Sequence, residues 1–543
     1  MDKLKRQREQ AVGLRNAGNL EQAANAMQTY LIKAPNDREV ALIYGDVLMR
    51  LERFEDAVKF YAKWIEKENK DALMLSNLGA ALLRQGKPAD AKTILEYVLE
   101  LDPKNVYARI NLGGVYQSLG DLNLALKNAL EAVSIDPTRA LTFNNLGSAF
   151  NDLAKFEEAK HAFETAVMLE PNQVDAIINL ASAESKLGNS KEAIRRYEEV
   201  IRLLPKESKH RREAIEFFAS FEHLMHADLQ KGWAYYEGGF SPLVPLAGAR
   251  SPKRVFKEPR WRGENIEGKT LLVWREQGIG DELLFATALH ELESTGAKII
   301  VETDPRFVET FTRSFPKYVV RAQAFNSLSF ESVHCDFDLQ IPIGALMRIY
   351  RSTLEDFDKN RPYIVVDPHK KQKFVERLAP YRDKKLVGFC WRSGKLDPVR
   401  NLTYTMIEDW ADVVSMQDYD FVNLQYGECE QELQRLEKMT GREIIRWNDL
   451  NLKDDLDDVF ALMSCLDFVV SVGTAVFPMA GACGRPSLML GGAYWATLGS
   501  DRDYPFFPSS RITGMRVGGA VSEELSKVGP LLDGRYFVKL RPS

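Results

Sequence analysis

The chain has 543 residues, enough for several domains that each bury a core of their own. Its composition, 45% hydrophobic and 27% charged, is typical of globular proteins, and a formal net charge of -5 argues against a nucleic-acid partner. The five cysteines form no C-x-x-C pair, so neither a zinc site nor a disulfide framework is expected. Since the N-terminus lacks the apolar core of a signal peptide and no apolar run is long enough to span a membrane, we expect a cytoplasmic protein.

The first part of the chain repeats with a period of 34 positions, the length of a tetratricopeptide unit. When the repeats are aligned, one equivalent position holds mostly proline, a second holds alanine, and a third holds small residues. The third position, the small column, includes Gly45, Gly79, Gly113 and Gly147. Small residues there let two antiparallel helices pack closely. Bulky residues of a further column fill the space beside them, at Met27, Tyr61, Leu95, Phe163 and Tyr197, while Ala129 interrupts that column. The pattern resembles the tetratricopeptide family over residues 5–205, as six repeats of an α-solenoid.

A column of asparagines bears on function. Asn77, Asn111, Asn145 and Asn179 occupy one position in the first helices of four repeats. First helices line the concave face in the tetratricopeptide family, and a carboxamide can pair with any peptide bond. The series resembles the asparagine ladder of the eukaryotic O-linked N-acetylglucosamine transferase, which implies binding of an extended polypeptide. The alternative is that each asparagine only bonds to its neighbouring repeat.

The repeat phase is lost beyond Pro205. Residues 206–240 read as capping helices, with an apolar stripe that includes Phe217, Phe221 and Leu224 and would cover the last repeat. Residues 241–268 are rich in proline and glycine, and we expect a linker lying over the surface.

Residues 270–290 read as a buried strand, a turn with Gly278 and Gly280, and a helix. Further strands are expected at 298–302, 319–320, 337–341, 386–390, 421–424, 468–472 and 487–490, with helices between most of them. Such alternation predicts parallel sheets with helices on both faces, and a break near 367–383 divides it into two units. Two facing doubly wound Rossmann-like domains, at 269–375 and 384–515, form the GT-B glycosyltransferase fold. Residues 516–543 are a C-terminal tail.

Several motifs carry a closer resemblance. The strings Q-G-I-G-D-E-L-L-F, W-R-S-G-K, F-V-N-L-Q-Y-G-E and S-V-G-T-A-V-F-P-M-A-G-A-C-G-R-P resemble those of bacterial proteins that fuse tetratricopeptide repeats to a GT-B domain. Some members of that group are flagellin glycosyltransferases that attach nonulosonic acids to Ser or Thr. The group is distantly similar to lipopolysaccharide heptosyltransferases, whose last motif has Asp-Thr-Gly and a His. Here Gly473, Thr474, Ala475 and Pro478 stand at those places, which argues against a heptose donor.

Glycosyl transfer needs a base for the acceptor hydroxyl and a partner for the departing phosphate. Asp281 is the candidate base, because the Gly-Asp turn of heptosyltransferases places its carboxylate in the cleft. The alternative is that Asp281 is an ordinary helix N-cap. Gln277 flanks the same turn and would orient the ligand.

The donor phosphates are expected at the carboxyl ends of the second domain's strands. Arg392, Ser393 and Lys395 lie in the loop after its first strand and could surround an anion. Thr474 begins a helix and could meet phosphate through its hydroxyl. Gln425 could contact the nucleobase or ribose, and Asp501 with Arg502 are weaker candidates.

The acidic triplets 336–338, 455–457 and 501–503 occur about as often as chance gives, so we expect no metal ion. The leading hypothesis is a metal-independent protein O-glycosyltransferase without a cofactor, using a CMP-activated nonulosonic acid or a nucleoside-diphosphate sugar. The resemblance names flagellin as the polypeptide acceptor, and exposed repeat faces also allow a homodimer. The alternative is a non-enzymatic peptide-binding adaptor or export escort with a degenerate transferase lobe.

Overall fold

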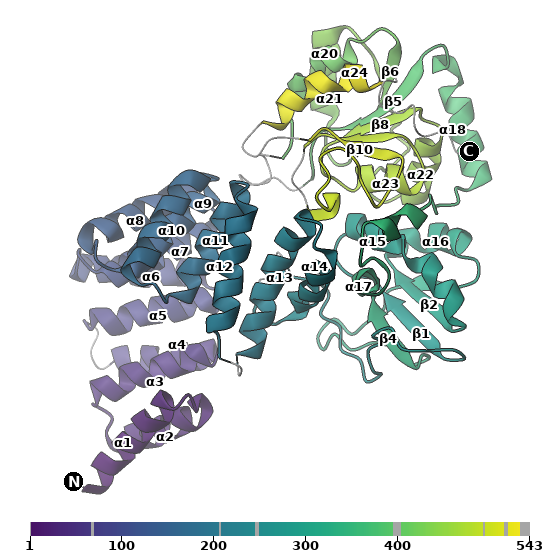
Figure 1. Ribbon diagram of the computed structural model, residues 1–543. Helices are drawn as coiled ribbons and strands as arrows, with labels where there is room; N and C mark the ends of the chain where they lie inside the picture. Colours follow the sequence, from purple (N-terminus) through teal and green to yellow (C-terminus); the bar gives the residue numbers. More distant parts are fainter. Residues whose placement is uncertain are drawn as a thin grey trace. The chain divides into compact units, whose positions relative to one another are not determined.

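The computed structural model describes residues 2–66, 70–205, 208–244, 249–394, 403–491, 495–514 and 520–532. The chain divides into two compact units, Met1–Ala183 and Glu184–Ser543. Helices make up the first unit, and the second combines helices with two parallel sheets. The fold is therefore an array of stacked tetratricopeptide helices followed by an α/β region that is consistent with GT-B, as predicted (Figure 1).

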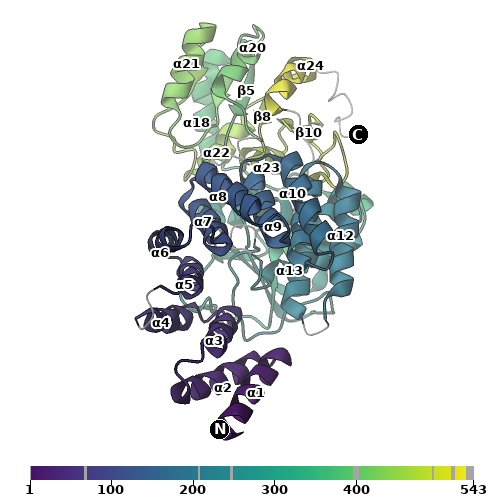
Figure 2. The same ribbon diagram turned by 90° about the vertical axis from the view of Figure 1, so that its left-hand side faces the viewer.

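The first unit is a series of antiparallel helix pairs that stack in chain order (Figure 2). Asp37 and Asp71 begin two first helices by accepting hydrogen bonds from backbone N–H groups of the opening turn. The helices are α1 (Asp2–Asn16), α2 (Leu20–Lys33), α3 (Arg38–Arg50), α4 (Phe54–Ile65), α5 (Ala72–Arg84), α6 (Pro88–Leu101), α7 (Val106–Leu119), α8 (Leu122–Ile135), α9 (Ala140–Asp152), α10 (Phe156–Leu169) and α11 (Val174–Lys186), the last crossing into the second unit.

The small column of the repeat packs against the bulky one. A Cβ placed on Gly79 would lie 2.5 Å from the Leu95 side chain, and one on Gly147 would lie 2.5 Å from the Phe163 ring. Gly113 has more room, with the Ala125 carbonyl oxygen 3.7 Å away, because Ala129 replaces a bulky residue in its repeat. The predicted packing of small residues against bulky ones is confirmed, as is its interruption at Ala129.

The second unit opens with helices α12 (Ser190–Leu203), α13 (Lys209–Met225) and α14 (Leu229–Tyr236) and the short 3-10 helix η1 (Glu237–Phe240). A four-stranded parallel sheet follows, ordered β3-β2-β1-β4. In its register Leu272 pairs with Ile300 on one side and Gln340 on the other. Its elements are β1 (Thr270–Trp274), α15 (Ile279–Ala286), η2 (Leu289–Thr295), β2 (Lys298–Thr303), η3 (Pro305–Phe307), α16 (Val308–Ser314), β3 (Val319–Ala322), β4 (Leu339–Pro342), η4 (Ile343–Ala345), α17 (Leu346–Tyr350) and η5 (Glu355–Lys359).

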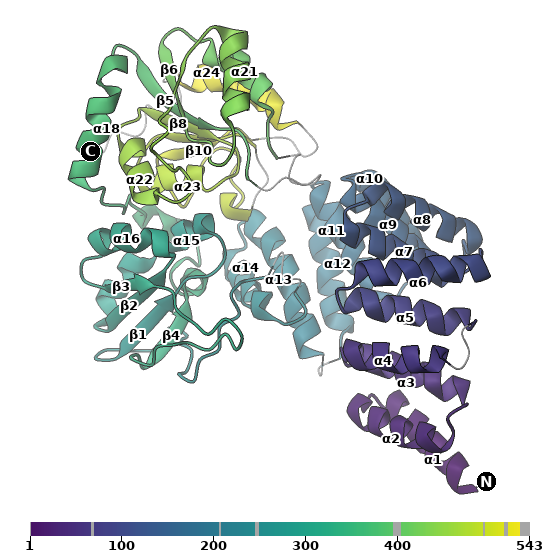
Figure 3. The same ribbon diagram turned by 180° about the vertical axis from the view of Figure 1, so that it is seen from behind.

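A six-stranded parallel sheet, ordered β10-β9-β8-β5-β6-β7, forms the other half of the α/β region (Figure 3). Gly388 lies centrally, paired with Val422 and Val469. The elements are α18 (Pro368–Leu378), η6 (Ala379–Tyr381), β5 (Lys385–Cys390), η7 (Ile407–Trp410), α20 (Ala411–Val414), β6 (Tyr419–Asn423), α21 (Glu430–Thr440), β7 (Ile444–Ile445), α22 (Leu456–Ser464), β8 (Phe468–Ser471), α23 (Val476–Ala482), β9 (Ser487–Met489), η8 (Trp495–Thr497), β10 (Ser510–Ile512), η9 (Val521–Lys527) and α24 (Val528–Leu532).

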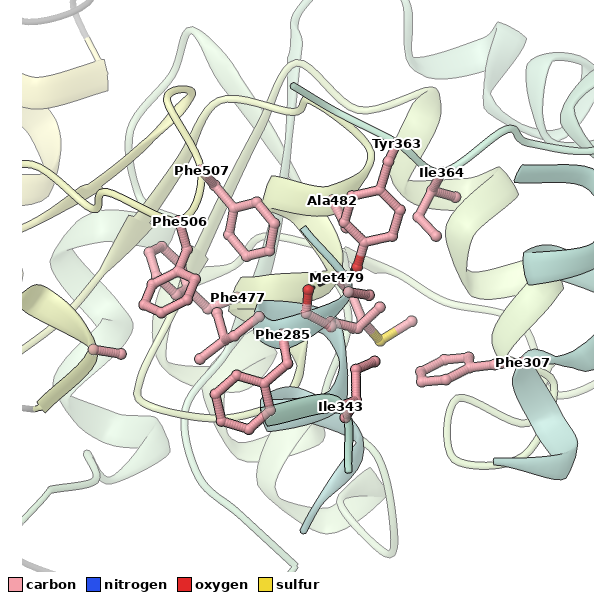
Figure 4. Packing of buried hydrophobic residues seen from close by; sticks show 14 of the residues in the cluster. Phe285, Phe307, Ile343, Tyr363, Ile364, Phe477, Met479, Ala482, Phe506 and Phe507 are labelled. Atoms are coloured by element: carbon pink, nitrogen blue, oxygen red, sulfur yellow. Dashed lines mark hydrogen bonds between the residues drawn. The ribbon is translucent and has the colours of Figure 1, made fainter. Parts of the chain in front are cut away.

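One buried hydrophobic cluster joins the two halves of the α/β region. Phe285 and Ile343 from the first half lie among Phe477 and Met479 of α23 (Figure 4). The Tyr363 hydroxyl donates a 2.7 Å hydrogen bond to the Leu283 carbonyl oxygen, which ties the connecting segment to α15. The two sheets therefore share a core.

One local expectation differs from the structure. The supposed surface linker buries Arg250, Trp261 and Ile266, because Arg250 pairs with Glu276, a residue distant in sequence. The segment near 367–383 lies between the last strand of the first sheet and the first strand of the second, and it contains α18, which packs on α22. Helix α13 packs on α12, and its Phe217 and Phe221 also contact Tyr236 and Trp495.

Candidate functional site

Turns at the carboxyl ends of the two sheets face each other. The first follows β1 and carries Gly278, Gly280 and Asp281, and the second follows β8 and carries Thr474. A Cβ on Gly280 would lie 3.6 Å from Pro478 Cγ and 3.7 Å from Ala475 Cα. Ala475 and Pro478 therefore pack directly on the Gly-Asp turn. Ligands of doubly wound sheets bind at such carboxyl ends.

Asp281 lies partly exposed in the first turn of α15, as its third residue. One carboxylate oxygen accepts a 3.4 Å hydrogen bond from the Gly278 N–H, so Gly278 is the N-cap residue and Asp281 caps the helix from its third position, which keeps the structural alternative in this form. Desolvation raises the pKa of Asp281 to about 6, opposed by the Gly278 hydrogen bond and aided by the negative charge of Glu276. A carboxylate tuned in this way is suited to general-base catalysis near neutral pH.

The other two acids of the motif have structural partners. Glu276 is fully buried and accepts hydrogen bonds from the Arg250 guanidinium and from the Gly344 N–H at 2.9 Å. Glu282 is also buried and binds the Arg275 guanidinium and the Thr303 hydroxyl. Both carboxylates are thus engaged within the protein, and Asp281 alone of the three is partly exposed.

Gln277 has a left-handed backbone, with φ of 63°, which is uncommon for a residue with a side chain. Its N–H donates a 2.7 Å hydrogen bond to the Ser251 carbonyl oxygen, and its side-chain amide lies 3.5 Å from the Tyr236 hydroxyl. The predicted ligand-orienting residue is therefore held by residues outside the sheet.

The loop after β5 differs from expectation at Arg392. The Arg392 guanidinium forms an ion pair with Glu432 and also donates to the Glu428 carbonyl oxygen at 2.8 Å. The Nε and Nη2 donors of Arg392 are therefore engaged within the protein. Ser393 lies beside the Tyr426 hydroxyl, at 3.4 Å, and Lys395 lies outside the described residues.

Gln425 is fully buried and holds the loop after β5 through hydrogen bonds to its backbone. Its side-chain oxygen accepts hydrogen bonds from the backbone N–H groups of Trp391, at 3.2 Å, and Arg392, at 3.0 Å. Its side-chain N–H donates to the Tyr426 carbonyl oxygen at 3.0 Å. The structure therefore corrects the expected contact with a nucleobase, because the amide is already paired and enclosed.

Thr474 is partly exposed in the turn after β8. Its hydroxyl lies 3.0 Å from the Ser471 hydroxyl and 3.6 Å from the Cys390 thiol. Burial raises the pKa of Cys390 to about 11, so this thiol is neutral at physiological pH. Cys390 and Ser471 were missed from the sequence, since only the fold brings the ends of β5 and β8 together.

The weaker candidates Asp501 and Arg502 are both exposed, beyond η8. No group of acids, histidines or cysteines with the arrangement of a metal site occurs among the described residues. In the acidic triplets, Asp336 pairs with Arg321, Asp457 with Arg313, and Asp503 with Arg511.

The asparagine column is half-buried and partly engaged. The Asn111 amide donates to the Ser76 carbonyl oxygen at 3.2 Å, and the Asn179 amide donates to the Asn144 oxygen at 2.9 Å, both across to the preceding repeat. Asn145 bonds its own helix, to the Leu141 carbonyl oxygen at 2.8 Å. Asn77 lies beside the Tyr61 hydroxyl as a hydrogen-bond partner. The amide groups of Asn111, Asn145 and Asn179 therefore act as donors, and these bonds leave the three amide oxygens as acceptors.

Comparisons with known proteins match the repeats and part of the whole chain. Tetratricopeptide repeat models match residues 8–72, 82–140 and 140–173. Protein FlbA of Caulobacter vibrioides is 33% identical over 293 residues, which are 52% of this chain and 48% of that protein. The match thus spans about half the length of this curated relative.

Among solved structures, MamA from Desulfovibrio magneticus RS-1 is 24% identical, with a TM-score of 0.26, covering 30% of this chain and 93% of that one. A thermophilic tetratricopeptide protein of Thermus thermophilus is 18% identical, with a TM-score of 0.31, covering 33% and 98%. Within the described ranges, no helix is both long and apolar enough to cross a membrane. The chain is a tetratricopeptide-repeat protein with a C-terminal parallel α/β region.

Proposed function

We propose that this protein is a glycosyltransferase that moves a sugar from a nucleotide donor to Ser or Thr of a polypeptide. The observation that carries the proposal is the pair of facing turns, in which Gly280 packs on Ala475 and Pro478 beside the Asp281 carboxylate. In this scheme Asp281 takes the proton of the acceptor hydroxyl. The hydroxyl oxygen then bonds to the anomeric carbon as the bond from that carbon to the donor phosphate breaks.

The leaving phosphate would bind the second turn and the loop after β5. Thr474 offers a hydroxyl there, and Gln425 holds the backbone of Trp391 and Arg392 in a fixed conformation. Lys395 would add a positive charge. The donor that we infer is a CMP-activated nonulosonic acid, with a nucleoside-diphosphate sugar as the other option.

The acceptor polypeptide would bind the repeats through the asparagine column. The oxygens of Asn111, Asn145 and Asn179 can accept hydrogen bonds from peptide N–H groups independently of sequence. The motif resemblance makes flagellin the acceptor to test first.

A second function, a peptide-binding adaptor without catalysis, is favoured by one observation. Arg392 is neutralised by Glu432 inside the protein, so this arginine supplies no free charge for a phosphate. The two functions differ in whether a sugar reaches the acceptor.

The test is intact-mass analysis of flagellin co-expressed with this protein and a nonulosonic-acid pathway. If the protein is a transferase, flagellin gains a sugar-sized mass. The rate at which modified flagellin appears should fall by about 100-fold or more with Asp281→Asn, the range for loss of a general base. Asp383→Asn is the matched control, because Asp383 is exposed in the turn before β5. Flagellin that is retained by the protein without any increment would favour the adaptor.

A further inference from the structure

The turn that carries Asp281 is held by residues from outside the sheet. The same turn contains a second acid, Glu276, which is completely buried. Its ion-pair partner Arg250, from the segment after η1, is completely buried as well. The Arg250 guanidinium lies 4.4 Å from the Tyr236 ring centre and 4.3 Å from that of Phe240. Two aromatic faces, the carboxylate of Glu276 and that of Glu237, 3.6 Å away, therefore fix this side chain.

The next residue along the chain also contacts the turn. The Ser251 carbonyl oxygen accepts the 2.7 Å hydrogen bond from the Gln277 N–H, and Gln277 is the residue with the left-handed backbone. A left-handed non-glycine residue persists only where its surroundings hold it. Arg250 and Ser251 thus contact the two residues that directly precede Gly278.

The packing around Arg250 leaves little room for rearrangement. A Cβ on Gly239 would lie 2.5 Å from Arg250 Cγ, and one on Gly344 would lie 2.5 Å from the Glu276 carboxylate. The Arg250 N–H also donates to the Gly239 carbonyl oxygen at 3.0 Å. Contacts with η1 therefore hold Arg250 in place, and Arg250 in turn holds the turn 276–281 through Glu276.

We propose that Arg250 is a positioning residue, which holds the turn 276–281 through Glu276 so that the Asp281 carboxylate reaches the acceptor hydroxyl. The catalytic part of this inference rests on the proposed glycosyl transfer. The structural part, that the turn depends on Arg250, does not. Arg250→Lys tests both, because lysine keeps the charge and loses the planar fork that binds both carboxylate oxygens.

Arg254→Lys is the matched control. Arg254 lies in the same segment and pairs, equally enclosed, with Glu302 of β2, at 2.5 Å. Its guanidinium lies 4.7 Å from the Phe256 ring centre and also donates to the Ala324 carbonyl oxygen and the Ser332 hydroxyl, so none of these partners belongs to the turn 276–281. Both variants lose one buried arginine fork, so general destabilisation affects both.

The first measurement is hydrogen exchange of the full-length protein, resolved to residues 276–281. We expect the Gln277 amide and its neighbours to exchange faster in Arg250→Lys, and at the wild-type rate in Arg254→Lys. Wild-type exchange of the turn in Arg250→Lys, or equal acceleration in both variants, would overturn the inference. This measurement needs no substrate, so it remains decisive if the protein transfers no sugar.

The second measurement is the rate of transfer with saturating donor. A misplaced turn is expected to lower kcat by about 100-fold in Arg250→Lys, as displacements near 1 Å do. An unchanged kcat in this variant, in a wild-type protein that is active, would refute the catalytic role. An inactive wild type would instead refute the proposed function.

Glu276→Gln gives a readout that a general packing defect would not change. The titratable groups facing Asp281 are Glu276 in the turn, Tyr236 on α14 and Tyr504 after η8, and burial raises the pKa of both tyrosines so that they are neutral. Removal of the Glu276 charge is expected to lower the pKa of Asp281 and to move the acid limb of the pH-rate profile to lower pH. A limb that stays in place would contradict the link between Glu276 and Asp281.

Discussion

At the scale of single residues, the main feature is the environment of Asp281. Its carboxylate is desolvated and lies near the Glu276 charge, and these effects outweigh the hydrogen bonds from the backbone N–H groups of Gly278 and of Asp281 itself. Its pKa of about 6 means that the native state holds this proton more tightly than the unfolded chain does. Ionisation of Asp281 therefore favours catalysis and opposes folding.

The pH dependence of stability follows from this sign. Because the folded-state pKa is raised, the stabilising contribution is complete below the unfolded-state pKa and is lost as pH rises through about 6. Asp281→Asn is therefore expected to melt at a higher temperature than wild type at pH 7.5, and this advantage should shrink towards pH 4. Thermal unfolding at several pH values, with Asp383→Asn as the exposed control, measures it. An advantage that is constant with pH would contradict the raised pKa.

Activity has the opposite pH dependence if Asp281 is the base. The carboxylate form is lost below about pH 6, so kcat should fall as pH decreases through that value. A transfer rate that is level from pH 7 to pH 5 would assign the base to another group.

At the scale of elements, the sequence predicted the regular parts of the chain well. All eight expected strands overlap observed ones, because each is a short apolar run bounded by turn residues. The strands that were missed, β7 and β10, are only two and three residues long and give no such signal. The facing glycine turns followed from the same pattern, since strand ends of parallel sheets meet at one edge.

The errors come from long-range partners. Gln425 has the sequence position of a ligand contact, but the backbone N–H groups of Trp391 and Arg392 occupy its amide oxygen. Arg250 lies in a segment with a linker composition, and only the fold reveals its partner Glu276. Composition and periodicity report local structure, whereas these pairings depend on residues tens of positions apart.

The repeat helices allow a comparison between two glycines of one column. Gly147→Ala places a methyl group 2.5 Å from the Phe163 ring and should cost about 1–3 kcal/mol of stability through overpacking. Gly113→Ala would make only an ordinary contact, 3.7 Å from the Ala125 carbonyl oxygen, and should instead stabilise α7 by about 0.5–1 kcal/mol, the helix preference of alanine over glycine. Thermal unfolding with hydrogen exchange of the repeats distinguishes them. Equal effects at both positions would contradict the role of Ala129 in relieving this packing.

At the scale of the whole molecule, the two units are each proposed to bind a different ligand. The repeats would hold a polypeptide, and the α/β region would hold a nucleotide sugar. Each unit has its own hydrophobic cores, so a change at the surface of one should leave the structure of the other intact.

The proposal that polypeptide and nucleotide sugar bind at separate sites can be tested with the double variant Asn111→Ala, Asn145→Ala. Both amides are half-buried, and the oxygens proposed to accept peptide N–H groups disappear with the side chains. We expect polypeptide affinity to fall by about 10-fold or more, at about 1 kcal/mol for each lost hydrogen bond. Nucleotides should still raise the melting temperature as in wild type, because ligand linkage acts on the other unit.

Asn123→Ala is the matched control for this pair, since Asn123 is exposed on α8, the second helix of its repeat. It should change neither polypeptide affinity nor the nucleotide-induced shift. If the double variant binds polypeptide like wild type, the asparagine column serves only to join neighbouring repeats, as the Asn111 to Ser76 bond already does. A parallel loss of nucleotide binding would show instead that the two ligands depend on one common structure.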